Sequence, residues 1–128
     1  MSGSPQILVV DDDQGVRRSL TLLLRGHGYR TKAYADGAAL AGDPEAAGAS
    51  LLLADYRMPA GDGFDLLEIL RGRGWNGAAV MITGHGSDWL RADAARAGFD
   101  GVIEKPLRPN LLLAAARRAV GPTSTIPA

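Results

Sequence analysis

The feature that most constrains the fold is a regular alternation between short apolar runs and longer stretches of helical period. Each run is bounded by polar residues or glycines and shows no alternation of apolar with polar residues. Runs of this kind are typical of strands that are buried on both faces of a parallel sheet. They occupy residues 7–10, 51–54, 78–82 and 101–103, with a weaker run at 30–34.

The stretches between the runs predict helices. Four of them carry apolar residues at helical spacing and end at a glycine. These stripes are Val16, Leu20, Leu23, Leu24 and His27, before Gly28; Phe64, Leu67 and Leu70, before Gly72; Leu90, Ala94 and Ala97, before Gly98; and Leu111, Leu112, Ala115 and Ala119, before Gly121. Residues 36–49 hold the remaining helix, which Gly42 and Pro44 predict to be short or broken.

Strands and helices that alternate in this way predict an α/β fold of five β-α units, (βα)5. We expect a doubly wound parallel five-stranded sheet with right-handed crossovers and helices on both faces. In such sheets, ligands bind beyond the carboxyl ends of the strands, where the strand order reverses. The residues that follow the strands are therefore the candidate functional residues.

Polar residues that suit phosphoryl chemistry follow four of the five strands: Asp11, Asp12 and Asp13, then Asp55, Thr83 and Lys105. Carboxylates held close together repel one another, and a cation among them or a shared proton relieves that repulsion. Oxygen ligands without His or Cys favour Mg²⁺. A carboxylate can also attack phosphorus to give an aspartyl phosphate, while an ammonium and a hydroxyl contact the other phosphoryl oxygens.

Each of these signals has a plainer interpretation when it is taken alone. Acidic residues after a strand are often helix N-caps, and Asp12 or Asp13 is expected to cap the next helix in any case. An isolated Asp55 or Thr83 suits a turn, and Lys105 suits a solvated loop. Their joint placement at one edge of the sheet favours a single phosphoryl site.

The composition excludes several functional classes. Cysteine is absent, so the chain has no disulfide, no catalytic thiolate and no Cys-ligated zinc. Lys+Arg and Asp+Glu are both 14, which does not predict direct nucleic-acid binding. The apolar run at 7–10 is too short for a signal peptide or a membrane span, so a cytoplasmic location is expected.

Four segments together resemble the signature of bacterial two-component response-regulator receiver domains. They are residues 7–12 (Ile-Leu-Val-Val-Asp-Asp), 55–59 (Asp-Tyr-Arg-Met-Pro) with Asp62-Gly63, 81–84 (Met-Ile-Thr-Gly) and 104–107 (Glu-Lys-Pro-Leu). The resemblance implies a receiver domain over residues 6–120, with a flexible N-terminal segment at 1–5 and a tail or linker at 121–128. It also implies the flavodoxin-like strand order 2-1-3-4-5.

The resemblance assigns a role to each residue of the site. Asp55 is the implied phosphoacceptor, and Thr83 and Lys105 contact the phosphoryl group. The implied Mg²⁺ ligands are Asp11 (largely through water), Asp12, Asp55 and the backbone carbonyl of Arg57. The Lys105–Pro106 peptide bond is expected to be cis. Arg57 and His85 stand where the family adjusts the lifetime of the phosphoryl group.

The implied function is phosphorelay signal transduction, not catalysis beyond the domain's own phosphorylation and dephosphorylation. The implied phosphodonor is a phosphohistidine on a sensor histidine kinase or a histidine phosphotransfer protein. The surface formed by the last two helices and the strand between them would control an output domain or a partner protein, and a homodimer is compatible with it. Val102 departs from the pattern, because many members carry Tyr or Phe there to follow the movement of the threonine.

Two alternatives remain open at this point. Asp11-x-Asp13 also resembles the nucleophile motif of haloacid-dehalogenase phosphatases, in which Asp11 would be the nucleophile. Those enzymes usually carry a further acidic pair after the lysine, and no acidic residue follows Lys105. The other alternative is a degenerate receiver that acts only in docking or dimerisation.

Overall fold

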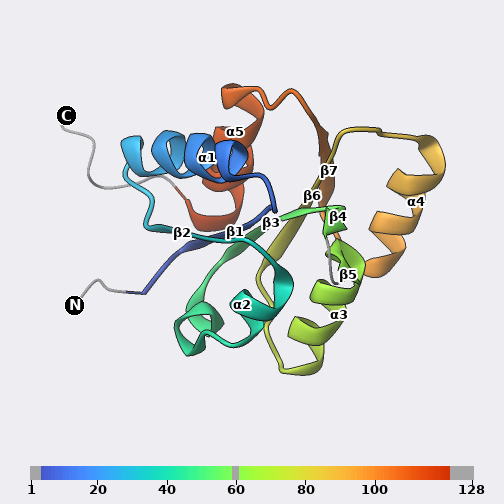
Figure 1. The fold of residues 1–128 in the computed structure, drawn as a ribbon, viewed down its shortest axis with the longest axis horizontal. Helices are drawn as coiled ribbons and strands as arrows, with labels where there is room; N and C mark the ends of the chain where they lie inside the picture. The colour runs from blue at the N-terminus through green and yellow to red at the C-terminus, as the bar shows by residue number, and fades with distance from the viewer. Residues whose placement is uncertain (1–3, 59–60, 122–128) are drawn as a thin grey trace.

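The main sheet has five parallel strands in the order β2-β1-β3-β6-β7 (Figure 1). The computed structural model describes residues 4–58 and 61–121. The strands are β1 (Ile7–Val10), β2 (Thr31–Tyr34), β3 (Leu51–Asp55), β6 (Ala78–Thr83) and β7 (Gly101–Glu104). The predicted order 2-1-3-4-5 is confirmed, because β4 and β5 lie outside this sheet.

Helices cover both faces of the sheet. α1 and α5 lie on one face, and α2, α3 and α4 lie on the other (Figure 1). The helices are α1 (Gln14–Gly26), α2 (Gly37–Ala41), α3 (Gly63–Gly72), α4 (Asp88–Ala97) and α5 (Pro109–Val120). The predicted break in residues 36–49 is confirmed: α2 ends at Ala41, and a separate 3₁₀ helix, η1 (Pro44–Gly48), follows it.

The apolar strands are explained by these two layers of helices. In β1, Ile7 and Val9 join the core under α1 and α5, whereas Leu8 and Val10 join the core under α2, α3 and α4. All four of these side chains are at most 1% exposed. No position of the strand faces water, so a polar residue has no place in it.

The parallel register brings the carboxyl ends of the strands to one edge of the sheet. Val10 lies beside Ala54 in β3, Asp55 lies beside Ile82 in β6, and Thr83 lies beside Glu104 in β7. The residues that follow β1 and β7, together with the last residues of β3 and β6, therefore meet at this edge.

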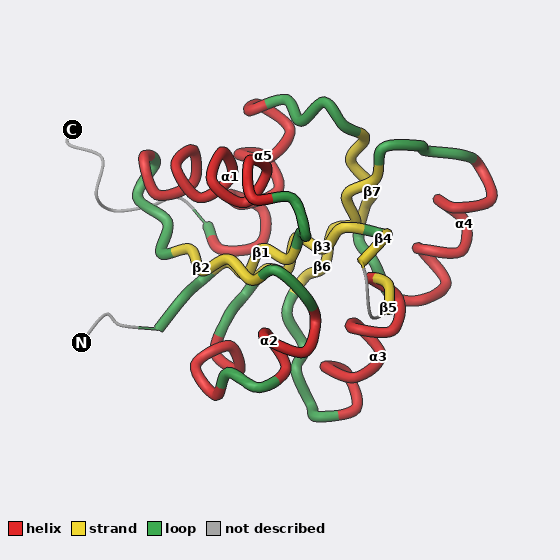
Figure 2. Tube along the Cα trace, in the orientation of Figure 1, coloured by secondary structure: helices red, strands yellow, loops and turns green. Residues whose placement is uncertain are grey.

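A short antiparallel hairpin of β4 (Arg57–Met58) and β5 (Gly61–Asp62), which the sequence analysis did not predict, follows β3 (Figure 2). Pro59 of the resemblance lies outside the described residues. After the hairpin, Gly63 begins α3, and a Cβ on Gly63 would lie 3.0 Å from the carbonyl oxygen of Asp55. Glycine at this position therefore lets α3 start directly against the end of β3.

The helical stripe is correct in α3, correct in α1 apart from His27, and partly wrong in α4 and α5. Leu111 is 44% exposed, and α5 instead buries Leu113 and Ala116 together with Leu112 and Ala115. Ala97 is exposed at the end of α4, and His27 is the exposed C-cap of α1 and not part of its apolar face. In runs such as 111–116 every residue is apolar, so helical spacing cannot determine which side turns inward.

The two ends of the chain are only partly described. Of the expected N-terminal segment 1–5, only Ser4 and Pro5 are described: Pro5 is buried, and the Ser4 carbonyl accepts a hydrogen bond of 2.7 Å from Arg30. Of the expected tail 121–128, all but Gly121 lies outside the described residues. Within the described part of the chain, no helix is both long enough and apolar enough to span a membrane.

Candidate functional site

Three carboxylates meet at the carboxyl edge of the sheet. One oxygen each from Asp11, Asp12 and Asp55 can be chosen so that all three lie within 4.8 Å of one another. Asp11 is fully buried, Asp55 is 6% exposed, and Asp12 is exposed. Asp12 and Asp55 border a hollow of about 450 Å³ whose lining also includes Tyr56, Arg57, Thr83, His85, Trp89 and Lys105. The predicted acceptor, hydroxyl and ammonium residues are thus brought together.

Lys105 provides the positive charge in this cluster. Its Nζ lies 3.1 Å from Oδ2 of Asp11 and 3.5 Å from Oδ1 of Asp55. The predicted cis peptide bond between Lys105 and Pro106 is confirmed. It lies directly after β7, where the chain turns away from the sheet.

Asp11 shows how well the site suits a cation. Its Oδ1 accepts a hydrogen bond of 2.9 Å from the backbone N–H of Asp13. Its Oδ2 is buried and accepts no hydrogen bond from a described residue, so the ion pair with Lys105 is its one polar contact there. A buried anionic oxygen with spare capacity, beside two further carboxylates, fits a hard divalent cation. The residues present could therefore hold a metal ion.

The charged form of the Asp55 carboxylate is electrostatically disfavoured. Burial, with the carboxylates of Asp11 and Asp12 adding to it, raises the pKa of Asp55 to about 6, and the Lys105 ammonium opposes the rise. Burial alone would lower the pKa of Lys105, but the carboxylates of Asp11 and Asp55 outweigh it and raise that pKa above its ordinary value. Additional positive charge would therefore stabilise Asp55 in its ionised, nucleophilic form.

Thr83 is buried at the end of β6, and its hydroxyl is engaged with the loop that follows. Oγ1 accepts a hydrogen bond of 3.1 Å from the backbone N–H of His85 and donates one of 3.3 Å to the His85 carbonyl. Arg57 is exposed in β4 and lines the same hollow. The metal-ligand role of its backbone carbonyl remains a prediction.

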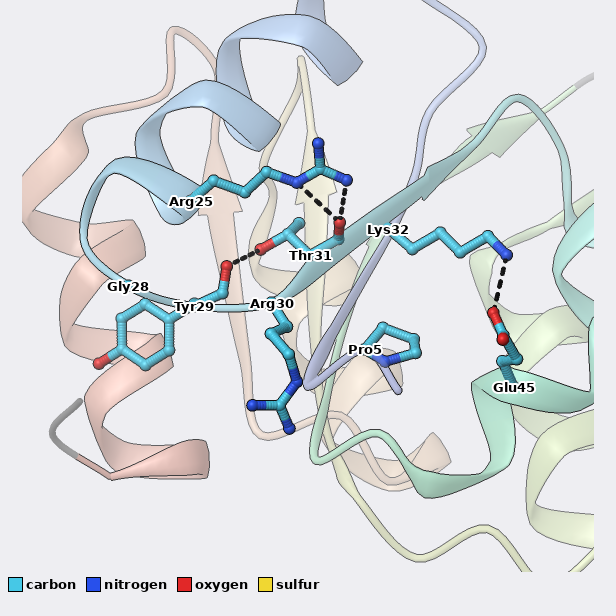
Figure 3. A pocket seen from close by; sticks show the side chains of 8 residues that line it. All are labelled: Pro5, Arg25, Gly28, Tyr29, Arg30, Thr31, Lys32 and Glu45. Atoms are coloured by element: carbon cyan, nitrogen blue, oxygen red, sulfur yellow. Dashed lines mark hydrogen bonds and ion pairs between the residues drawn. The ribbon is translucent and has the colours of Figure 1, made fainter. Parts of the chain in front are cut away.

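A second hollow, of about 480 Å³, lies beside β2 and does not contain the carboxylate cluster (Figure 3). Its cations already have partners. The Arg25 guanidinium donates two hydrogen bonds to the Thr31 carbonyl, and Lys32 pairs with Glu45 (Figure 3). Lys32 also pairs with Asp43. The candidate functional site is therefore the hollow beside Asp55.

Asp13, the third acid of the run, has a structural role. It is the N-cap of α1, and its side chain accepts hydrogen bonds from the backbone N–H groups of Gly15 and Val16. We expect Asp13→Ala to lower the free energy of unfolding by about 1 kcal/mol, because two N–H groups of the first turn lose their acceptor. Chemical denaturation measures this loss, and Asp13→Ser should restore most of it.

Metal titrations of Asp13→Ala and Asp12→Ala separate the roles of these two residues. Mg²⁺ affinity should be almost unchanged in Asp13→Ala and should fall at least tenfold in Asp12→Ala, an order of magnitude typical of the loss of a carboxylate ligand. Equal losses of affinity in the two variants would contradict the division of roles.

The comparison with known families decides the assignment. The family model for the response regulator receiver domain matches residues 7–117. The chain belongs to this family. The receiver domain is 36% identical over 123 residues to the transcriptional regulatory protein FixJ of Azorhizobium caulinodans, and 35% identical over 112 residues to FixJ of Rhizobium meliloti. These matches cover 94% and 87% of this chain but only 57% and 54% of the relatives.

Solved structures agree with this assignment. The crystal structure of FixJ-N superposes with a TM-score of 0.79 at 32% identity, over 100% of this chain and 99% of that one. The chemotaxis protein CheY4 of Vibrio cholerae superposes with a TM-score of 0.82 at 26% identity, over 92% of this receiver domain and 100% of CheY4. The receiver domain spans little more than half the length of the two FixJ relatives.

Glu104 belongs to the site region, although the resemblance implies no role for it. Its carboxylate contacts the loop after Thr83. The available signal was a charged residue at the last position of an otherwise apolar strand.

Proposed function

We propose that this receiver domain accepts a phosphoryl group on Asp55 from a phosphohistidine donor, in a reaction that depends on Mg²⁺. The observation that carries the proposal is the buried Asp55 carboxylate, which is clustered with Asp11 and Asp12 and lies 3.5 Å from the Lys105 ammonium. In the transfer, an Asp55 oxygen forms a bond to phosphorus as the P–N bond of the donor breaks, and the donor histidine leaves as a neutral imidazole after taking up a proton.

Each residue of the site has a separate role in the proposed transfer. Lys105 balances negative charge on the phosphoryl oxygens, and the Thr83 hydroxyl donates a hydrogen bond to one of them. Asp11, Asp12, Asp55 and the Arg57 carbonyl would hold Mg²⁺. The ion supplies positive charge against the transferring phosphoryl group. Arg57 and His85 border the same hollow and so control how water reaches the product.

Signal output follows from the connections of these residues. The loop after Thr83 leads into α4, and the chain after Lys105 leads into α5. The phosphoryl group therefore biases the surface formed by α4, β7 and α5 through its contacts with both residues. Residue 102 is a valine, which is partly buried and packs on the same core as α4. Because it has no aromatic ring to follow a movement of Thr83, shifts of the loops and helices would couple Thr83 to the α4-β7-α5 surface.

The biological setting is proposed from the relatives. Two of them are named transcriptional regulatory proteins. We place this domain in a cytoplasmic two-component pathway, where a sensor histidine kinase or a phosphotransfer protein donates the phosphoryl group. An output domain or a partner protein, or a second copy of the chain, would read the α4-β7-α5 surface.

The test is incubation with acetyl phosphate and Mg²⁺, followed by mass spectrometry of the intact protein. We expect one base-labile phosphoryl group per chain, no incorporation with EDTA, and none in Asp55→Asn. Glu68→Gln, which changes an exposed carboxylate of α3, is the control and should behave as the wild type.

The same experiment separates the alternatives. A phosphatase would release phosphate from the donor through Asp11 and would survive Asp55→Asn. The burial of Asp11 and its ion pair with Lys105 speak against that role. A docking module would show no incorporation at all, and either result would contradict the proposed function.

A further inference from the structure

We propose that Glu104 is a positioning residue that holds the loop after β6 and thereby the hydroxyl of Thr83. The inference rests on the proposed phosphorylation of Asp55 and adds a residue that controls it. Glu104 ends β7, directly beside β6 and close to α4 (Figure 1). In the strand register it is the partner of Thr83 itself.

One carboxylate joins three elements. Oε2 of Glu104 accepts a hydrogen bond of 3.1 Å from the backbone N–H of Gly86, in the loop between β6 and α4. Oε1 accepts one of 2.6 Å from the Arg91 guanidinium on α4. Arg91, followed by the Gly86 N–H, holds the pKa of Glu104 below its ordinary value, so the carboxylate remains ionised at neutral pH. Glu104 thus ties the loop and the start of α4 to β7.

The Glu104 carboxylate occupies the space that a side chain at residue 86 would fill. A Cβ at Gly86 would lie 2.5 Å from Cδ of Glu104 and 2.8 Å from each of its oxygens. The φ angle of Gly86 is not positive, so the backbone conformation itself is open to alanine. The need for glycine here is steric, and an added methyl group would displace the Glu104 side chain.

The contact at Gly86 acts on Thr83 through His85, the residue between the held glycine and the Thr83-Gly84 turn. Thr83 has a single hydroxyl proton, and it is donated to the His85 carbonyl. The hydroxyl oxygen also accepts the His85 N–H. To donate to a phosphoryl oxygen on Asp55, the hydroxyl must release that carbonyl. Glu104 holds the N–H of Gly86, which belongs to the same peptide group as the His85 carbonyl. It therefore favours the arrangement in which the Thr83 hydroxyl stays bonded to the loop.

The expected effect is modest, because the participants are partly in water. The side chains of Glu104 and Arg91 are 48% and 42% exposed, and ion pairs of that kind contribute little. Releasing the loop should let Thr83 reach the phosphoryl group more often and raise the rate of phosphorylation by acetyl phosphate about two- to fivefold.

The experiment measures phosphorylation rates of the full chain with acetyl phosphate and Mg²⁺. Glu104→Ala and Gly86→Ala should each accelerate the reaction about two- to fivefold. The double variant should be no faster than either, because both changes remove the same contact. Glu104→Gln, which keeps an acceptor for Gly86, should lie closer to the wild type. Asp93→Ala, which removes an ion pair with Arg96 elsewhere on α4, is the matched control and should change nothing.

Two further readouts separate positioning from a general structural effect. In a Thr83→Ala background, Glu104→Ala should no longer alter the rate, because the group that it positions is gone. Amide hydrogen exchange of His85 and Gly86 should become faster in Glu104→Ala without phosphorylation. An acceleration that persists in Thr83→Ala, or unchanged exchange, would overturn the inference.

The outcome for the wild type keeps this inference distinct from the proposed function. A wild-type chain that takes up no phosphoryl group would overturn the proposed function and the kinetic role of Glu104 with it. A wild-type chain that is phosphorylated normally, beside a Glu104→Ala variant with the same rate, would overturn only the role of Glu104.

Discussion

Asp55→Asn is expected to raise the free energy of unfolding of the metal-free protein at pH 7 by about 2–3 kcal/mol, although it removes the proposed phosphoacceptor. The reason is the raised pKa of Asp55, about 6 against an ordinary value of 3.8, which burial and the neighbouring carboxylates of Asp11 and Asp12 produce. A shift of about two units corresponds to about 3 kcal/mol. The asparagine amide must find partners in the same place, which reduces the gain.

The sign follows from proton linkage. The folded protein holds the Asp55 proton more tightly than the unfolded chain does, so the wild type loses stability as pH rises between the two pKa values, 3.8 and about 6. Asn carries no charge at any pH. The advantage of Asp55→Asn should therefore be small near pH 4, grow through pH 6 and remain constant above it.

Urea denaturation in the presence of EDTA, at a series of pH values, measures this difference. Glu68→Gln is the control and should follow the wild type, since that carboxylate is exposed on α3. A difference between Asp55→Asn and the wild type that does not change with pH would show that the Asp55 charge is not its source. Saturating Mg²⁺ should stabilise the wild type and narrow the gap.

Lys105→Met is expected to lower the free energy of unfolding by about 2–3 kcal/mol at pH 7 without metal. The substitution removes the ammonium from Oδ2 of Asp11, which is buried and accepts no hydrogen bond among the described residues. Leaving one buried charge without its partner costs about 3–5 kcal/mol, and the 29% exposure of the Lys105 side chain reduces that figure. The pKa of Lys105 is raised, so its stabilising contribution is fully present at pH 7 and is lost only above pH 10.5.

The chain provides a matched control, because Lys32 is its only other lysine. Lys32 pairs with Asp43 and Glu45 at the surface with 43% of its side chain exposed, so Lys32→Met should cost much less stability than Lys105→Met. Adding Asp55→Asn to Lys105→Met should recover part of the loss, because one of the repelling carboxylates is then neutral. Equal losses for Lys32→Met and Lys105→Met would contradict the electrostatic account of the site.

Local signals in the sequence predicted most of the fold. Short strands without polar residues, such as 7–10 and 51–54, predicted burial on both faces, and the structure confirms it. The break at Gly42 and Pro44 was equally local. Where local signals were ambiguous, the prediction failed. The run 111–116 is apolar throughout, and only the packing of α5 against the sheet decided that Leu113 is buried and Leu111 is exposed.

For the candidate site too, the sequence determined one part and the tertiary structure decided the rest. The sequence determined which residues stand at the ends of the strands, because strand ends are marked by the change from apolar to polar residues, as from Val10 to Asp11. The β4-β5 hairpin and the contact of Glu104 with Gly86 were decided only by the tertiary structure. The contact of Glu104 with Gly86 joins residues far apart in the chain, and its energy depends on a distance that appears only when β6 and β7 lie side by side. The same holds for the raised pKa of Asp55, since burial and the approach of Asp11 exist only in the folded chain.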